Sequence, residues 1–165
     1  MRVALLAARV RRPLRRFLRD KRGVSAVEFA DDRKTTLVAR TLGDLVAQST
    51  SVNATDMTNI LNAATTVVQP YADAQLKVTV SRVDVDANGA AKVIWSKAKN
   101  TTARAANSSV TLPAALNTAN TSLIWAETQY SYTPTIGYVI TGTMQLKDQI
   151  YMRPRLSDTV TCNAC

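Results

Sequence analysis

The chain has 165 residues, a formal net charge of +9 at pH 7 and no histidine. The lack of histidine removes the commonest general base and excludes a serine–histidine triad. Residues 1–23 contain nine of the 21 basic residues and one of the 12 acidic residues, so this arm carries +8 and the rest of the chain only +1. A protein that binds nucleic acid normally spreads its basic residues over a folded face, and the body of this chain lacks that excess.

Residues 1–23 form a basic leader in which apolar residues recur at helical spacing, interrupted by Pro13. Such a segment can adhere to an anionic membrane surface, and an RNA- or DNA-binding arm is the alternative. We favour the membrane, because positive charge just before a membrane entry point keeps that end in the cytoplasm. The basic residues nearest the end of the leader are Arg11, Arg12, Arg15, Arg16, Arg19, Lys21 and Arg22.

A glycine, four small or apolar residues and a Glu-Phe pair come next, with the glycine at Gly23 and the pair at Glu28 and Phe29. This arrangement resembles the processing site of type IV prepilins and pseudopilins, in which a membrane-embedded aspartyl peptidase cuts after the glycine. Glycine has no side chain, so its backbone can enter a narrow protease cleft in an extended form. The resemblance implies a new N-terminus at Val24, and a pairing of Glu28 with the free amine of a neighbouring subunit, since an unpaired carboxylate is costly in an apolar layer. The alternative is an ordinary helix start with Ser25 as its cap.

Proteins of this class continue from the Glu-Phe pair into a long apolar helix. Here four charged residues, Asp31, Asp32, Arg33 and Lys34, follow at once. A membrane span needs about 20 mostly apolar residues, and no window of this sequence supplies them. We therefore expect that the chain does not span a bilayer, that its arm adheres to one at most, and that the chain can be soluble.

Two helices are predicted before the first strand. Residues 31–48 place apolar side chains on one stripe, and the run at residues 49–51 ends that helix. A second helix should start near residues 53–55, which hold good N-cap residues, and stop at Pro70. The expected buried stripes are Val38, Leu42, Leu45 and Val46 in the first helix, and Met57, Ile60, Leu61, Ala64 and Val68 in the second.

From Leu76 the apolar period changes to two, as in a strand. The phase slips between Val80 and Val83, which predicts a bulge near residues 81–82. Asn88 and Gly89 indicate a tight turn, and residues 93–95 begin the returning strand. Residues 99–122 are predicted to form a long loop, residues 123–132 and 148–155 two further strands, and residues 135–142 stay ambiguous.

Helices grouped before antiparallel strands indicate an α+β fold, with N-terminal helices packed on one face of a small antiparallel sheet. We divide the chain into the leader at residues 1–23, a truncated pilin-like first helix at 24–48, an α+β domain at 49–161 and a tail at 162–165. The body is long enough for one hydrophobic core.

Few residues suggest other chemistry, and we expect no catalytic residue, no cofactor and no metal site. Cys162 and Cys165 form a C-x-x-C at the end of the sequence, which we interpret as an exposed disulfide formed in an oxidising compartment; a metal shared by two copies is the alternative. The run from Asp84 to Gly89 has only part of a calcium loop and is better explained by a hairpin turn. Four asparagines, Asn53, Asn100, Asn107 and Asn120, each start an N-x-S/T triplet, which we attribute to loop composition.

Taken together, residues 17–30, 32–40 and 150–155 resemble the TadE/TadG-like pseudopilins of bacterial tight-adherence (Flp) pilus systems. The resemblance implies a structural minor pilin or assembly factor that is not an enzyme. It implies the inner membrane as location, with the α+β domain in the periplasm. Its partners would be a prepilin peptidase, pilins and other pilus-assembly proteins, and the membrane surface. A small nucleic-acid-binding protein that uses its arginine-rich arm is the alternative, although we do not expect nucleic acid as a partner.

Overall fold

The computed structural model describes residues 22–67, 69, 73–132, 143–163 and 165. Several predictions fall outside these ranges and stay predictions. They concern residues 1–21 of the leader, Val68, Pro70 and residues 135–142. The chain separates into two units, Met1–Asp31 and Asp32–Cys165. Helix α2 spans Arg22–Ala47.

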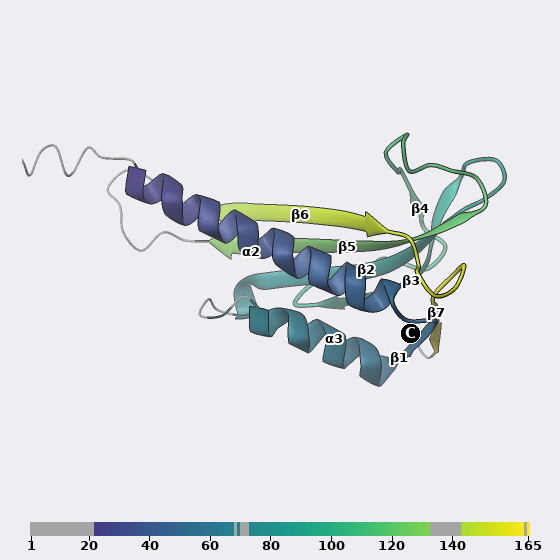
Figure 1. Ribbon diagram of the computed structural model, residues 1–165, viewed down its shortest axis with the longest axis horizontal. Coiled ribbons are helices and arrows are strands. Elements are labelled where there is room, and N and C mark those ends of the chain that lie inside the picture. The colour runs from purple at the N-terminus through teal and green to yellow at the C-terminus, as the bar shows by residue number, and fades with distance from the viewer. Residues whose placement is uncertain (1–21, 68, 70–72, 133–142, 164) are drawn as a thin grey trace, which may run out of the picture. The chain divides into compact units, whose positions relative to one another are not determined.

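The described residues form an α+β structure, which confirms the predicted class. Five strands make an antiparallel sheet in the order β4-β3-β2-β5-β6 (Figure 1). Two more strands, β1 and β7, pair in parallel beside it. The remaining bounds are β1 Ser51–Asn53, α3 Ala54–Val67, a 3₁₀ turn at Asp73–Gln75, β2 Leu76–Val85, β3 Ala91–Lys99, β4 Ser109–Val110, β5 Thr121–Tyr132, β6 Met144–Met152 and β7 Thr161–Asn163.

Helix α3 begins where the sequence predicts, because Asn53 and Asp56 cap it reciprocally. The Asp56 N–H donates to Asn53 Oδ1 at 2.9 Å, and the Asn53 N–H donates to Asp56 Oδ2 at 3.0 Å. This exchange satisfies two backbone donors that the helix itself leaves unpaired. Helix α2 ends at Ala47, one residue before the predicted end.

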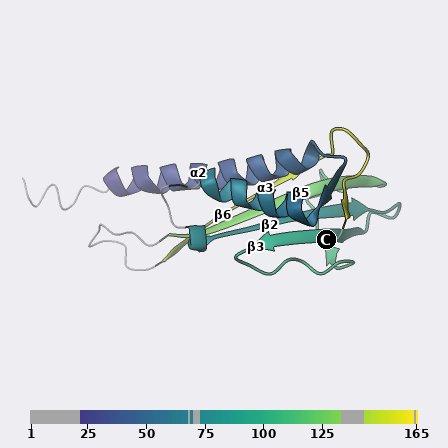
Figure 2. The same ribbon diagram turned by 90° about the horizontal axis from the view of Figure 1, so that it is seen from below.

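Residues 32–47 of α2 and helix α3 lie on the same side of the sheet (Figure 2). Their buried side chains meet those of β2 and β5 in one cluster, which we call the helix-side core. The predicted stripe of α2 is correct except at Leu45, which is 39% exposed because its neighbour Val46 takes the position facing the sheet. The principal members of the core are Val38, Leu42, Val46, Met57, Leu61, Leu76, Val78, Val80, Ile124, Ala126 and Tyr130.

A second cluster, the far-side core, lies on the opposite face of the sheet. It contains Val83 and Val85 of β2 with Val93, Leu112, Leu123 and Trp125. The loop that follows β3 covers this core and forms the short strand β4, which the sequence analysis did not predict. In that loop Asn100, Asn107 and Asn120 have φ of 59°, 62° and 58°. Asparagine tolerates the left-handed region better than most residues do. The backbone conformation therefore explains why asparagine occupies these three positions.

The phase slip along β2 has a different cause from the one predicted. The pairing shifts between Arg82 and Val83, close to the expected position. The extra residue, however, is Ile94 of β3, since Trp95 pairs with Arg82 and Val93 pairs with Val83. Strand β2 itself alternates regularly, and its apolar phase changes because the helices cover one face at its start and the loop covers the other face at its end.

The last predicted strand is misplaced. It was expected at residues 148–155, but β6 occupies Met144–Met152 and pairs with β5 from Tyr132↔Met144 to Ile124↔Met152. Its first half was concealed by polar residues, because Gln145, Lys147 and Gln149 face away from the helix-side core and Asp148 breaks the apolar alternation. Strands β1 and β7 have three residues each, which is too short for a periodic signal.

Gly43 marks the closest approach of α2 to the sheet. A Cβ at this position would lie 3.2 Å from Met152 Sδ, 3.3 Å from Ile150 Cγ2 and 3.6 Å from Ala126 Cβ. We predict that Gly43→Val lowers the free energy of unfolding by about 1–3 kcal/mol through overpacking, measured by urea denaturation. The control Arg40→Val, at an exposed site of the same helix, should cost less than about 1 kcal/mol. Equal losses in the two variants would mean that α2 does not need this close contact.

Candidate functional site

The predicted processing segment lies in the first two turns of α2. Gly23, Val24, Glu28 and Phe29 all belong to the helix, which begins at Arg22. The helix start predicted with Ser25 as the cap is therefore wrong, because Ser25 lies inside the helix. Positions 24 and 28 are four apart and so lie one turn apart on the same side of α2. Apart from Arg22, the leader arginines and Lys21 lie outside the described residues.

The two cysteines are joined in a disulfide at the C-terminal end, with 5.5 Å between the Cα atoms of Cys162 and Cys165. Cys162 belongs to β7 and pairs with Val52 of β1. The Thr161 N–H donates to the carbonyl of Thr50 at 3.2 Å, and the Arg155 N–H donates to the carbonyl of Ala47 at 2.8 Å. The segment after β6 thus holds the connection between the two helices.

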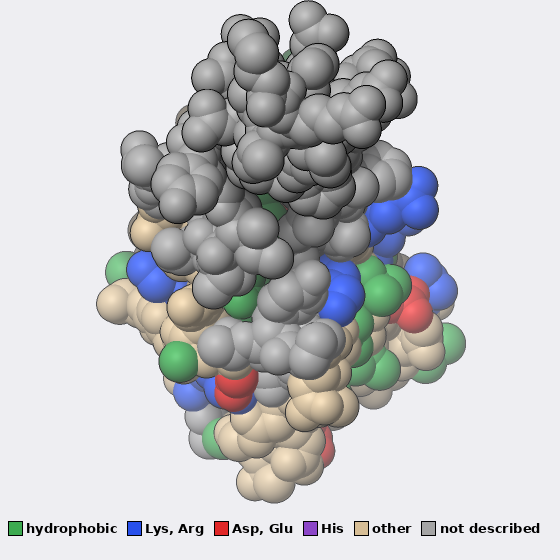
Figure 3. Space-filling model, turned by 90° about the vertical axis from the view of Figure 1, so that its left-hand side faces the viewer, with side chains coloured by type: hydrophobic (Ala, Val, Ile, Leu, Met, Phe, Trp, Pro, Cys, Tyr) green, Lys and Arg blue, Asp and Glu red, His purple; other side chains and the backbone are tan. Residues whose placement is uncertain are grey.

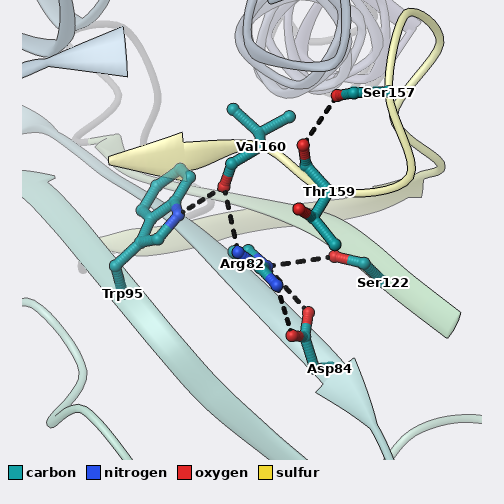
Figure 4. A network of polar contacts seen from close by, with 7 residues as sticks. All are labelled: Arg82, Asp84, Trp95, Ser122, Ser157, Thr159 and Val160. Atoms are coloured by element: carbon teal, nitrogen blue, oxygen red, sulfur yellow. Dashed lines mark hydrogen bonds and ion pairs between the residues drawn. The ribbon is translucent and has the colours of Figure 1, made fainter. Parts of the chain in front are cut away.

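A partly buried polar network ties the same segment to the sheet (Figure 4). The Val160 carbonyl accepts hydrogen bonds from Trp95 Nε1 at 2.9 Å and from Arg82 Nη1 at 3.5 Å. Arg82 Nε donates to Asp84 Oδ1 at 2.8 Å and to Ser122 Oγ at 3.2 Å. Arg82 and Asp84 lie on the helix-side face of β2, beyond the end of the apolar contacts. Their charges are paired, and the network is structural.

A second polar group lies on the far side of the sheet, next to the far-side core. Arg104 comes from the loop after β3 and forms a two-pronged ion pair with Glu127 of β5, with N–O distances of 2.9 and 2.8 Å. Its guanidinium also lies 4.0 Å from the centre of the Trp125 ring, a cation–π contact. Trp125 stacks on Tyr151 at 5.3 Å between ring centres. Burial raises the pKa of Tyr151, the Glu127 carboxylate raises it further, and Arg104 lowers it.

A groove of about 740 Å³ extends from this group over the sheet, and we call it the polar groove. Its floor has two rows of side chains that the strand register places across β2, β5 and β6. Residues 101–104 form a wall. One row is Lys77, Gln129 and Lys147, and the other is Thr79, Glu127 and Gln149.

The run from Asp84 to Gly89 forms the hairpin turn that the sequence predicts. Asp86 Oδ1 accepts the N–H groups of Asn88 at 2.8 Å and of Ala90 at 2.9 Å. Gly89 has φ +80°, as the tight turn requires. Asp84 is paired with Arg82. In the described ranges no group of three or more acidic or cysteine side chains could hold a metal ion.

Neither the polar groove nor the Arg82 network was predicted from the sequence. Arg104 lies in a stretch that was predicted only as a loop, and it reaches Glu127 across 23 residues of sequence. The sequence does carry one signal for the groove. Polar Lys77 and Thr79 alternate with buried valines along β2, and Glu127 and Gln129 alternate with buried residues along β5. That pattern indicates a polar sheet face but does not show that a loop lines it.

Comparisons with protein-family models, with curated proteins and with solved structures each find no match to this chain. The family resemblance therefore rests on the residues quoted above. Within the part of the chain that the structure describes, no helix combines the length and the apolar character needed to cross a membrane.

The Arg82 network should contribute to stability as a coupled pair. We predict that Arg82→Met lowers the free energy of unfolding by about 1–3 kcal/mol, because Asp84 loses its partner and the Val160 carbonyl loses a donor. Adding Asp84→Leu should recover part of this loss, since no charge is then left unpaired. Urea denaturation of the two single variants and the double variant measures the interaction energy. Strictly additive effects would contradict the coupling.

Tyr151 should make stability depend on alkaline pH. Folded Tyr151 keeps its proton to a higher pH than an unfolded tyrosine, whose pKa is 10.0. Its contribution is therefore fully present below that pKa and is lost as the pH rises through the raised folded value. We expect the free energy of unfolding of Tyr151→Phe to fall less steeply with pH than that of the unchanged chain between about pH 9 and 11. Urea denaturation across this range measures both slopes, and parallel curves would exclude the effect.

Proposed function

We propose that this protein is a structural component of a pilus-type assembly, a pseudopilin or minor pilin related to the TadE/TadG-like proteins of tight-adherence (Flp) systems. It is processed after Gly23 by a prepilin peptidase at the inner membrane. It then acts through helix packing and protein–protein contacts, with its sheet domain in the periplasm. Its partners are the peptidase, pilins and other assembly proteins.

The observation that carries the proposal is the continuity of α2. One helix of 26 residues contains both the Gly23–Phe29 segment and the residues that pack against an antiparallel sheet. A pilin-like protein uses its first helix in this way, with one end for assembly and the other anchored in a globular domain. The order of helices before the sheet agrees with this arrangement.

Two further features support the proposal. Leu37 and Leu45 lie on α2 with 52% and 39% of their surface exposed, and apolar residues on the outer side of a helix suit contact with another helix. The disulfide between Cys162 and Cys165 suits an oxidising compartment such as the periplasm.

The alternative of a nucleic-acid-binding protein depends on the leader. On the face drawn in Figure 3, the described Lys and Arg side chains lie at separate places with Asp and Glu side chains among them. The leader would then have to supply most of the phosphate contacts. In that case binding should fall steeply with salt and vanish when residues 2–22 are deleted.

Processing tests the proposal directly. The full chain and a version with about 20 apolar residues inserted after Ala30 are each expressed with an active prepilin peptidase. Intact mass and N-terminal sequencing then locate the new terminus. We expect the anchored version to lose residues 1–23 and to begin at Val24. Gly23→Val should block the cut, because a side chain at this position obstructs the protease cleft.

Two controls accompany this experiment. Ser25→Ala, two residues beyond the cut, should still be processed, and a peptidase without its catalytic aspartates should leave every version intact. An anchored chain that stays uncut with an active peptidase would overturn the proposed processing. Cleavage at another bond would overturn the assignment of Gly23.

A further inference from the structure

Two lysines that line the polar groove have no ion-pair partner among the described residues. Lys77 of β2 and Lys147 of β6 both lie opposite Gln129 of β5 in the strand register. Adjacent strands are about 4.8 Å apart, so the two backbones are roughly 10 Å apart. Both lysines are exposed, and neither forms an ion pair with an acidic side chain among the described residues.

The acidic residues around the groove are already engaged. Glu127 has both carboxylate oxygens bound to Arg104. Asp148 also lines the groove, but it falls between two far-side residues of β6, so alternation directs its side chain to the other face. Its Oδ1 accepts the Gln149 N–H at 2.8 Å. The charge available to a ligand is therefore positive.

The rest of the lining consists of groups that bind hydroxyls. Thr79, Thr101 and Thr102 bring hydroxyl groups, Gln129 and Gln149 bring amides, and the single apolar residue in the lining is Ala103. Most pockets for drug-like molecules are largely apolar. A lining of this kind suits a hydrated ligand rich in hydroxyl groups.

The aromatic residues beside the groove do not offer a stacking platform. Arg104 lies over the Trp125 ring, and Tyr151 stacks with that ring. Single-stranded nucleic acids bind largely by stacking bases on such rings, so this face is poorly suited to them. An acidic peptide would find few apolar positions for its side chains here.

We propose that the polar groove binds an acidic oligosaccharide, a sugar chain whose carboxylates contact Lys77 and Lys147 while its hydroxyls contact the threonine and glutamine side chains. The ion pair of Arg104 with Glu127 holds the wall of the groove in place. This binding activity goes beyond a structural role in assembly and does not depend on processing at Gly23.

The test is a titration of the isotope-labelled full chain with a galacturonic acid tetrasaccharide, followed by amide chemical shifts. The readout must be resolved by site, because the leader also carries positive charge. We expect saturable shifts at Thr79, Thr101 and Gln149. The double variant Lys77→Gln/Lys147→Gln should weaken the affinity derived from these shifts at least about tenfold, since two charge-assisted hydrogen bonds are lost.

A matched control removes the same charge elsewhere. The variant Lys92→Gln/Lys97→Gln changes two lysines of β3 that do not line the groove, and it should bind as tightly as the unchanged chain. Equal weakening in both variants would show that only net charge matters and would overturn the proposal.

Three further probes separate the ligand classes. A neutral galactose tetrasaccharide should produce much smaller shifts because it has no carboxylates for the two lysines. Inorganic phosphate should do the same because it has no sugar hydroxyls for the threonine and glutamine side chains. A tetraglutamate peptide that binds as tightly as the acidic sugar would assign the groove to acidic peptides instead. Shifts confined to residues outside the groove would also refute the proposal.

Discussion

Helix α2 lies so close to strands β5 and β6 that residue 43 has no room for a side chain without displacement of Met152 or Ile150. This contact decides much of the structure. It brings Val38, Leu42 and Val46 onto the apolar face formed by Ile124 and Ala126.

The sheet is covered on both faces, but by different elements and at different places. Helices cover one face near the start of β2, and the loop after β3 covers the other face near its end. The part of the far face that the loop leaves open is the polar groove. The groove is polar because its side chains, which come from every second residue of β2, β5 and β6, face neither core and can therefore be hydrophilic. Arg104 stands at the boundary, where it contacts Trp125 of the far-side core and Glu127 of the groove.

Several backbone groups of the C-terminal segment hydrogen-bond to the rest of the domain. The carbonyl of Val160 accepts hydrogen bonds from side chains of β2 and β3. The N–H groups of Arg155 and Thr161 donate to the last residue of α2 and to Thr50 after it. A fully buried carbonyl needs such donors, because an unpaired polar group in the interior is costly. The disulfide joins Cys165 to Cys162, which lies in β7 and pairs with β1. The proposed role in assembly requires a domain of this kind, which stays intact while its first helix makes contacts elsewhere.

Local pattern was enough to predict the class of fold, the capping of α3 by Asn53, the turn at Gly89 and most of the apolar stripe of each helix within the described residues. These features depend on residues within a few positions of one another, so that spacing and capping chemistry determine them. Tertiary structure alone decided the placement of the bulge at Ile94, the exposure of Leu45, the full extent of β6 and the pairing of β1 with β7. Each of these depends on which partner lies opposite, and the partners are separated by many residues of sequence. The groove has the same origin, because Lys77, Glu127, Lys147 and Arg104 come together only when three strands and a loop take up their register.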